Sequence, residues 1–469
     1  MPIPIICKKI SAAILFGLFS FNVFTGLSFA EDGISSPAVI TFDKFCDKVI
    51  AYYPKLKMEN ARVEIAIAKK LQAVYGYLPK IKGFTSMTTS NDQVYVFGTL
   101  LKQRAFTQED FSLSRLNNPS SRTNYDIGLY GEMPIFDSLQ TVYKVRQGKH
   151  LAASARYDEL FSSMEAILIA ADAYIHTLAV DELLRIADEA CRESDSDVKQ
   201  AEELKNKGLV LGADFYAAKV AYGNLKSIRN ELSFRRDGMY ALINILMGED
   251  PSKPIKLTDG LDDKGADGKA LGEWINDAYR LRPDLLSIDE AIRAQEAELD
   301  RERARALPNI SAFGDIRENT QNFNTGGGSF AVGLKGSVDI FDPEYFARVR
   351  IAKAALEKIK HEKDAAKDSV AKEITDEYSR FRSSRANLPV LRDMSDDSAQ
   401  AVTLMAPLYR EGRKSIADLM EMRRTYLQSS EGYYGAMAGA KLSRSRLLFL
   451  SGQLDRNRAK EAFSGEEGR

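Results

Sequence analysis

The sequence predicts a mixed α and β fold made of a duplicated α-β-β-α repeat, with four strands in the chain. Three observations support this prediction. Sequence blocks recur in the same order in the two halves, apolar and polar residues alternate through the second strand of each expected hairpin, and no helix-breaking glycine occurs from Lys149 to Lys207 or from Pro343 to Glu411.

The repeat is visible in three pairs of blocks. The first pair is Leu78-Pro79-Lys80-Ile81 and Leu307-Pro308-Asn309-Ile310. The second is Gly128-Leu129-Tyr130-Gly131 with Ile135-Phe136-Asp137, and Gly333-Leu334-Lys335-Gly336 with Ile340-Phe341-Asp342. The third joins Gly208, Ala213, Asp214, Tyr222, Leu246 and Gly248 to Gly412, Ala417, Asp418, Tyr426, Leu450 and Gly452. We therefore divide the chain into residues 1–30, a first repeat at 31–248, a linker at 249–272, a second repeat at 273–452 and a polar tail at 453–469.

The first thirty residues are predicted to be a signal peptide. Two lysines precede an apolar run from Ile10 to Phe24, and Ser28-Phe29-Ala30 supplies the small residues of a cleavage site. No later stretch has the roughly eighteen apolar residues that a membrane-spanning helix needs. The exported protein is therefore either soluble or crosses a membrane through closed β-structure. Two cysteines remain, Cys46 and Cys191. We expect both to be unpaired, although a disulfide between them is a possible alternative.

Composition excludes several classes of protein. Among 469 residues, 65 Lys and Arg balance 66 Asp and Glu, which excludes a strongly basic nucleic-acid binder and an acidic disordered tail. His150, His176 and His361 lack metal-ligand spacing, and no HExxH, CxxC or GxSxG motif occurs. We expect no enzymatic activity, cofactor or metal. Arg301, Arg303 and Arg305 are interpreted as a solvated helix face.

Each repeat is expected to begin with a helix that leads into a strand. Residues 59–77 and 287–306 are rich in helix formers, and each segment ends at a proline. The second strand of each hairpin, at residues 124–135 and 330–340, alternates apolar or glycine positions with polar or small ones. One face is therefore apolar. From these strands alone, this alternation favours a half-buried soluble sheet over a lipid-facing one, and period alone cannot place the strands in lipid.

Long helices should follow the strands. Asp137 and Asp342 are expected N-caps, and each helix could run about 100 Å at 1.5 Å per residue before Gly208 or Gly412 reverses the chain. We expect Pro389 and Pro407 either to kink the second long helix or to end it early. Shorter helices return over 214–247 and 418–450. Helices of this length need lateral partners, so a coiled-coil bundle is implied.

The two hairpins differ in length. The first carries an insertion, expected within Asn91 to Thr123, which reads as a long polar loop that faces the cell surface. Its counterpart, Asn319 to Ser329, contains Gly326-Gly327-Gly328, a glycine run without the ending of a phosphate-binding loop. A flexible hairpin tip is the better interpretation.

These motifs, in this order and in two copies, resemble the TolC-like outer-membrane efflux family. The resemblance covers about Thr41 to Leu454 and includes Leu408-Tyr409-Arg410-Glu411-Gly412 before Asp418-Leu419. It implies a homotrimer with a twelve-stranded outer-membrane β-barrel and a long α-helical periplasmic tunnel. It also implies a passive exit duct that works with a periplasmic adaptor protein and an inner-membrane pump, of RND or ABC type, in efflux or type I secretion.

The resemblance also implies roles for single residues. Asp418 and Glu421 would line a periplasmic constriction, and Asp214, Tyr409 and Lys414 would form links that hold it closed. Gly208 and Gly412 would reverse the helices at the periplasmic tips. From the residues alone, the favoured interpretation is an exposed intrahelical pair for Lys414 and Asp418 and plain helix packing for Tyr409. The alternative function is a soluble periplasmic coiled-coil scaffold whose sheet packs internally. The transported cargo cannot be inferred from these residues.

Overall fold

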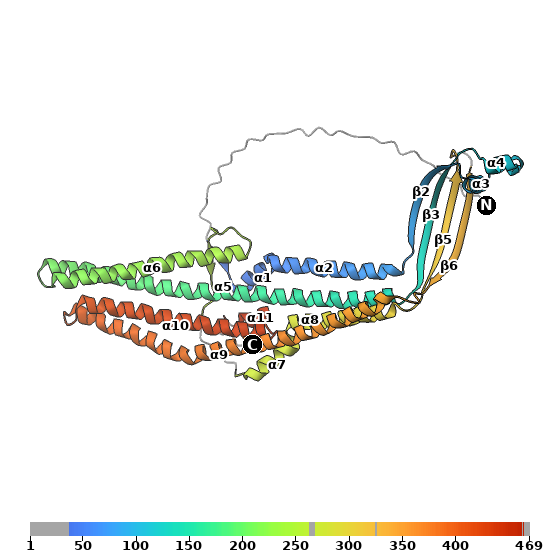
Figure 1. Ribbon diagram of the computed structural model, residues 1–469. Helices are drawn as coiled ribbons and strands as arrows, with labels where there is room; N and C mark the ends of the chain where they lie inside the picture. The colour runs from blue at the N-terminus through green and yellow to red at the C-terminus, as the bar shows by residue number, and fades with distance from the viewer. Residues whose placement is uncertain (1–36, 262–267, 324–325, 462, 464–469) are drawn as a thin grey trace, which may run out of the picture.

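The computed structural model describes residues 37–261, 268–323, 326–461 and 463. The predicted signal peptide lies outside the described residues. A bundle of long helices occupies one end of the molecule, and a four-stranded sheet occupies the other (Figure 1). Among the described residues, no helix combines the length and the apolar composition needed to cross a membrane.

The two halves of the chain have the same order of elements. The first contains α1 (Phe42–Tyr52), α2 (Pro54–Val74), β2 (Lys80–Ser90), β3 (Arg122–Asp137), α5 (Gln140–Asn206) and α6 (Gly212–Leu246). The second contains α7 (Leu271–Leu281), α8 (Pro283–Ala304), β5 (Asn309–Thr320), β6 (Gly326–Ser337), α9 (Pro343–Arg410) and α10 (Ile416–Leu450). Helices α2 and α8 begin earlier than expected because Pro54 and Pro283 occupy their first positions. An N–H at the first position of a helix has no partner within the helix, so proline, which lacks the N–H, is tolerated there.

The long helices are continuous. Helix α5 has 67 residues and α9 has 68, so each is about 100 Å long. Helix α9 runs through Pro389 and Pro407, so neither proline ends it. At the far end Gly208 and Gly412 have φ of +74° and +71°, the left-handed conformation that terminates a helix. In each turn the next residue's N–H reaches back to the carbonyl of Leu204 or Leu408, so both glycines reverse the chain as predicted.

The starts of the two long helices differ. Asp342 is the N-cap of α9, and its carboxylate accepts the N–H of Glu344. The prediction that Asp137 is the N-cap of α5 is wrong, because β3 extends through Asp137 and the cap position is Leu139, at φ +59°. The carboxylate of Asp137 still accepts the N–H of Thr141 at 2.8 Å, so it satisfies a free donor of the first turn from outside the helix.

The main hydrophobic core lies midway along the bundle. Helix α1 buries Phe42 and Phe45 against Tyr174 of α5. Residues 249–272 contain more structure than expected, because β4 (Ile255–Leu257) pairs in parallel with β1 (Ala38–Ile40) and α7 begins at Leu271. The tail is not simply polar either. Its short helix α11 (Arg456–Lys460) returns to this core, where Phe463 stacks on Phe42.

The sheet has the order β2-β3-β5-β6, and every pair is antiparallel. Strand β6 ends at Ser337, three residues before the predicted end. The insertion predicted as a loop instead contains α3 (Gln93–Lys102), a 3₁₀ turn (Gln108–Phe111) and α4 (Leu113–Asn117). It folds because it contains enough aromatic residues to form a small core of its own. The mostly polar composition of the segment hid this property.

Candidate functional site

The register places most of the large apolar strand residues on one face of the sheet, whereas Phe84 and Phe313 lie on the other. Leu129 lies opposite Gly83 on one side and Ile316 on the other, and Ile316 lies opposite Phe330. The large apolar side chains of this face are exposed: Ile81 71%, Leu129 55%, Ile316 65%, Phe330 78%, Val332 77% and Leu334 70%. We call this surface the apolar face. A sheet that packs internally would bury it, so the soluble-scaffold alternative is not favoured.

The opposite surface, which we call the polar face, carries charges and amides. Glu132 binds Lys335 at 2.6 Å and accepts a hydrogen bond from Ser311 at 2.9 Å. Arg317 pairs with Asp315 in the same strand. Three strands are therefore joined by polar side chains on the surface that would tolerate water. Unequal faces of this kind are typical of a sheet between lipid and an aqueous lumen.

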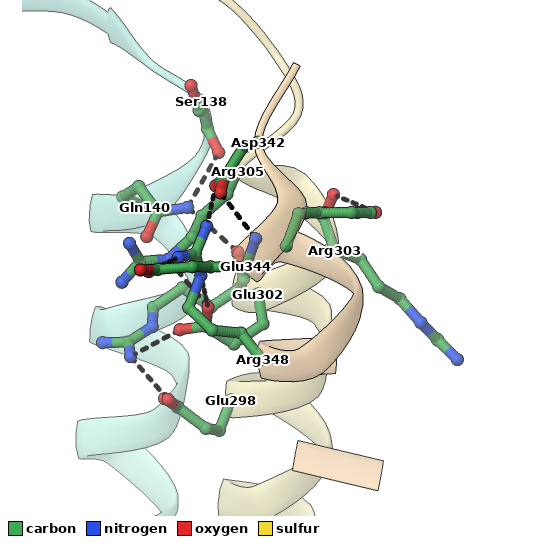
Figure 2. A network of polar contacts seen from close by, with 11 residues as sticks. Ser138, Gln140, Glu298, Glu302, Arg303, Arg305, Asp342, Glu344 and Arg348 are labelled. Carbon is green, nitrogen blue, oxygen red and sulfur yellow. Dashed lines mark hydrogen bonds and ion pairs between the residues drawn. The ribbon is translucent and has the colours of Figure 1, made fainter. Parts of the chain in front are cut away.

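A polar network joins the sheet to the helices (Figure 2). Glu302 of α8 is buried, and its carboxylate lies 3.1 Å from Arg301, 2.8 Å from Arg305 and 3.7 Å from Arg348. Arg348 also pairs with Asp342 and Glu344 at the start of α9. The network fixes the direction in which α9 leaves the sheet.

The network corrects one prediction. Arg301, Arg303 and Arg305 were expected on a solvated helix face; Arg303 and Arg305 are exposed as expected, but the side chain of Arg301 is only 18% exposed and binds Glu302. Figure 2 shows that Arg303 alone among the three points away from the cluster. Gln140 connects a third helix, α5, to the network, because its side chain donates a hydrogen bond to the carbonyl of Arg301 at 2.9 Å.

The far end of the bundle contains the predicted constriction and link residues. A cavity of about 710 Å³ lies between the two helix reversals, and its walls include Asp214, Tyr409, Lys414 and Asp418. Tyr409 is only 6% exposed, and its hydroxyl donates to the main-chain carbonyl of Asp197 in α5 at 3.4 Å. Burial, and secondarily the charge of Asp197, raises the pKa of Tyr409. The structure thus brings all three predicted link residues to one cavity.

The two predicted constriction carboxylates have different surroundings. Asp418 forms a capping box at the start of α10, in which Ser415 accepts the N–H of Asp418 and the Asp418 carboxylate accepts that of Ser415. Glu421 lies one turn further along, where it accepts a hydrogen bond from Arg424 at 2.9 Å. This hydrogen bond to Arg424 lowers the pKa of Glu421.

Sequence reasoning missed a buried cluster beside this cavity. Arg423 of α10 is 2% exposed; its guanidinium lies 2.7 Å from the carboxylate of Asp197 and donates to Ser194 at 3.0 Å. A signal was present, because Arg423 occupies a helical position between Leu419 and Leu427, both of which are buried. A basic residue in such an apolar stripe predicts a buried acidic partner.

The expectation that both cysteines are unpaired is confirmed. Cys46 and Cys191 are both free thiols. Within the part of the chain that the structure describes, no group of three or more His, Cys, Asp or Glu residues is placed to hold a metal ion.

Comparison with known proteins identifies the fold of the chain and a family match in its second half. Residues 274–453 match the family described as outer membrane efflux protein. Protein CyaE of Bordetella pertussis is 22% identical over 319 residues, which are 65% of this chain and 67% of CyaE. The Campylobacter jejuni CmeC outer membrane channel superposes with a TM-score of 0.74 at 17% identity, covering 90% of this chain and 89% of CmeC.

Another solved structure supports the same assignment. The outer membrane protein VceC of Vibrio cholerae gives a TM-score of 0.70 at 14% identity, with 88% of this chain and 96% of VceC covered. The resemblance inferred from the sequence is therefore confirmed. The second half of the chain matches the outer membrane efflux protein family, and the chain as a whole has the fold of solved outer-membrane channels.

Proposed function

We propose that three copies of this outer-membrane exit duct assemble into one channel, with a twelve-stranded barrel continued by a periplasmic helical tunnel. The observation that carries the proposal is the exposed apolar face opposite a charged polar face. Strands β2 and β6 also form the two edges of the sheet, with 11 and 12 residues whose outer hydrogen-bonding groups need partners. Neighbouring copies supply those partners.

Three is the number of copies that fits a duct. Four strands from one chain cannot close a barrel, two chains would give a barrel whose interior side chains fill it, and three leave room for a lumen. Crosslinking in native membranes should trap a trimer that survives in detergent. A monodisperse detergent-solubilised monomer would contradict the proposal.

Membrane fractionation tests the duct against the soluble scaffold. The duct should stay with the outer membrane after a high-salt wash, because the apolar face holds it there and salt does not weaken apolar burial. Release into the wash would favour the scaffold.

Proteins of this family work with periplasmic adaptors and inner-membrane pumps. We propose the same arrangement here, with the far end of the bundle meeting the adaptor and a pump of RND or ABC type supplying the energy. The cargo is selected mainly by that pump. A deletion strain scored for both drug susceptibility and lost secreted proteins would distinguish efflux from type I secretion.

We further propose that Asp418 and Glu421 line a constriction near the helix reversals. Three chains would bring six carboxylates around one axis and favour cations. Arg424 neutralises part of this charge through its hydrogen bonds to Glu421. Replacing Asp418 and Glu421 with Ala should weaken cation selectivity in planar bilayers, and Arg424→Ala should strengthen it. Glu431→Gln, further along the same helix, is the matched control. Unchanged selectivity in the double variant would reject the ring.

The proposed links are tested separately. Tyr409 contacts α5 across the cavity, and Lys414 lies in the turn before α10. Tyr409→Phe combined with Lys414→Ala should raise single-channel conductance because the inward helices are freed. Asp214→Asn should act in the same direction. Unchanged conductance would reject the links and leave the duct assignment standing.

A further inference from the structure

The insertion between β2 and β3, residues 91–121, is a folded body at the end of the sheet opposite the helices (Figure 1). We call it the outer insertion. The ring of Phe106 lies edge-on to Phe97 at 5.1 Å and to Phe111 at 4.9 Å between ring centroids. Arg115 pairs with Glu109 and Asp110 at the surface of this small core. The outer insertion is therefore held in one shape by its own side chains.

Hydrogen bonds anchor the outer insertion to the polar face. Gln103, only 4% exposed, donates to the carbonyl of Thr123 at 3.0 Å and to the side chain of Asn124 at 2.9 Å. Asn124 in turn donates to Asn319 of β5 at 2.8 Å. Asn124 and Asn319 belong to the same set of alternate positions as Asp126, which register assigns to the polar face. The end of α3 is thus tied to the polar surface and not to the apolar one.

A second anchor reaches the edge strand. Arg104 donates to the carbonyl of Gly328 at 3.1 Å. At Gly327 an added Cβ would lie 1.9 Å from the carbonyl oxygen of Lys102, so only glycine allows α3 to come this close. Gly327 lies opposite Asn319 and therefore also on the polar face. The outer insertion spans this face from β3 to β6.

We propose that the outer insertions form a second, size-selecting constriction at the outer mouth of the duct. The inference rests on the proposed trimer, because the polar face becomes the wall of a lumen only when three sheets close. Each chain then places one folded body over the wall at its outer rim, where it narrows the exit. The connection between β5 and β6 has only five residues, 321–325, too few for such a body, so the constriction has three parts and not six.

The test places a cysteine on the polar face beneath the outer insertion. Ala331 lies four residues along β6 from Gly327, about 13 Å deeper at 3.3 Å per residue. Intact cells carrying Ala331→Cys and Cys191→Ser are treated with a small charged maleimide or with one joined to a bulky polyethylene glycol. Burial raises the pKa of Cys46 to about 12, so this remaining thiol reacts slowly, and the same chain without the Ala331 change gives the background.

Two variants open the proposed constriction. In the first, residues 91–121 are replaced by three glycines. The second, Gly327→Ala, leaves the outer insertion complete but pushes α3 off the strand. Its matched control is Gly336→Ala on the same strand, where the nearest atom to an added Cβ is 3.8 Å away.

The small reagent should label every chain that carries Ala331→Cys at the same rate. The bulky reagent should label the two opened variants at least ten times faster than the parent and the Gly336→Ala control. If the bulky reagent labels all variants at the same rate while the small reagent still labels them, the lumen is open and the outer constriction is overturned. If the small reagent labels none of them, the polar face does not line a surface-accessible lumen, and the proposed duct geometry fails with it.

Discussion

Replacing Arg423 is expected to loosen the end of the bundle farthest from the sheet. Arg423 belongs to α10 and binds Asp197 at 2.7 Å and Glu193 at 3.1 Å, both in α5. It therefore joins the second half of the chain to the first beside the cavity of the proposed constriction. Arg423→Met keeps a similar apolar length and removes only the charge and its donors.

The expected magnitude follows from burial. Asp197 is 4% exposed, so without Arg423 its carboxylate is left in an apolar setting without a cation. Removing one partner of a buried ion pair costs about 3–5 kcal/mol. Because about 1.4 kcal/mol corresponds to a factor of ten, local opening should become more frequent by roughly 100-fold or more. Adding Asp197→Asn should recover part of the loss, since the unpaired charge is removed.

Native-state hydrogen exchange measures this directly. Amides of residues 190–206 in α5 should exchange faster in Arg423→Met, whereas amides around Tyr174 in the central core should not. Arg424→Met is the matched control, because Arg424 is exposed and pairs only along its own helix with Glu421. Equal exchange in Arg423→Met and Arg424→Met would refute the reasoning, as would a double variant with Asp197→Asn no more protected than Arg423→Met alone.

Three further predictions concern the rest of the chain. Glu302→Leu should lower the free energy of unfolding by about 1–2 kcal/mol, because three partly exposed arginines lose their shared carboxylate, and a thermal melt should show it; an unchanged melting temperature would argue against the network. Gly412→Ala should destabilise the turn by about 1–2 kcal/mol because of its positive φ, whereas Gly435→Ala inside α10 should stabilise by up to about 1 kcal/mol; effects of the same sign would contradict this account. An epitope tag at Asn117 should be labelled on intact cells, and labelling only after permeabilisation would exclude the proposed topology.

The elements with strong local signals could be predicted from sequence. The glycines at 208 and 412, the proline-ended first helices and the period-two strands each express a single backbone constraint, and the structure places them as expected. Where two constraints competed, prediction was less accurate. Asp137 carries an N-cap signal, but pairing with β5 extends β3 through it, and capping is achieved from the strand.

Tertiary contacts explain the remaining differences. The polar composition of the outer insertion concealed three phenylalanines that meet only after the chain folds back. Arg301 looked solvated because its partner Glu302 is buried by neighbouring helices and not by residues near it in sequence. Arg423 was identifiable in principle from its position in an apolar stripe, but its acidic partners lie more than two hundred residues away.

Lipid contact along β6 tests the central claim most directly. Spin labels placed one at a time at Ser329, Phe330, Ala331, Val332, Leu334 and Lys335 report access to oxygen, which concentrates in lipid, and to a water-soluble relaxing agent. The duct predicts a period of two, with Phe330, Val332 and Leu334 reached by oxygen and Ser329, Ala331 and Lys335 reached by the water-soluble agent. Equal access to water at all six positions, or an alternation of opposite phase, would contradict a sheet whose apolar face meets lipid.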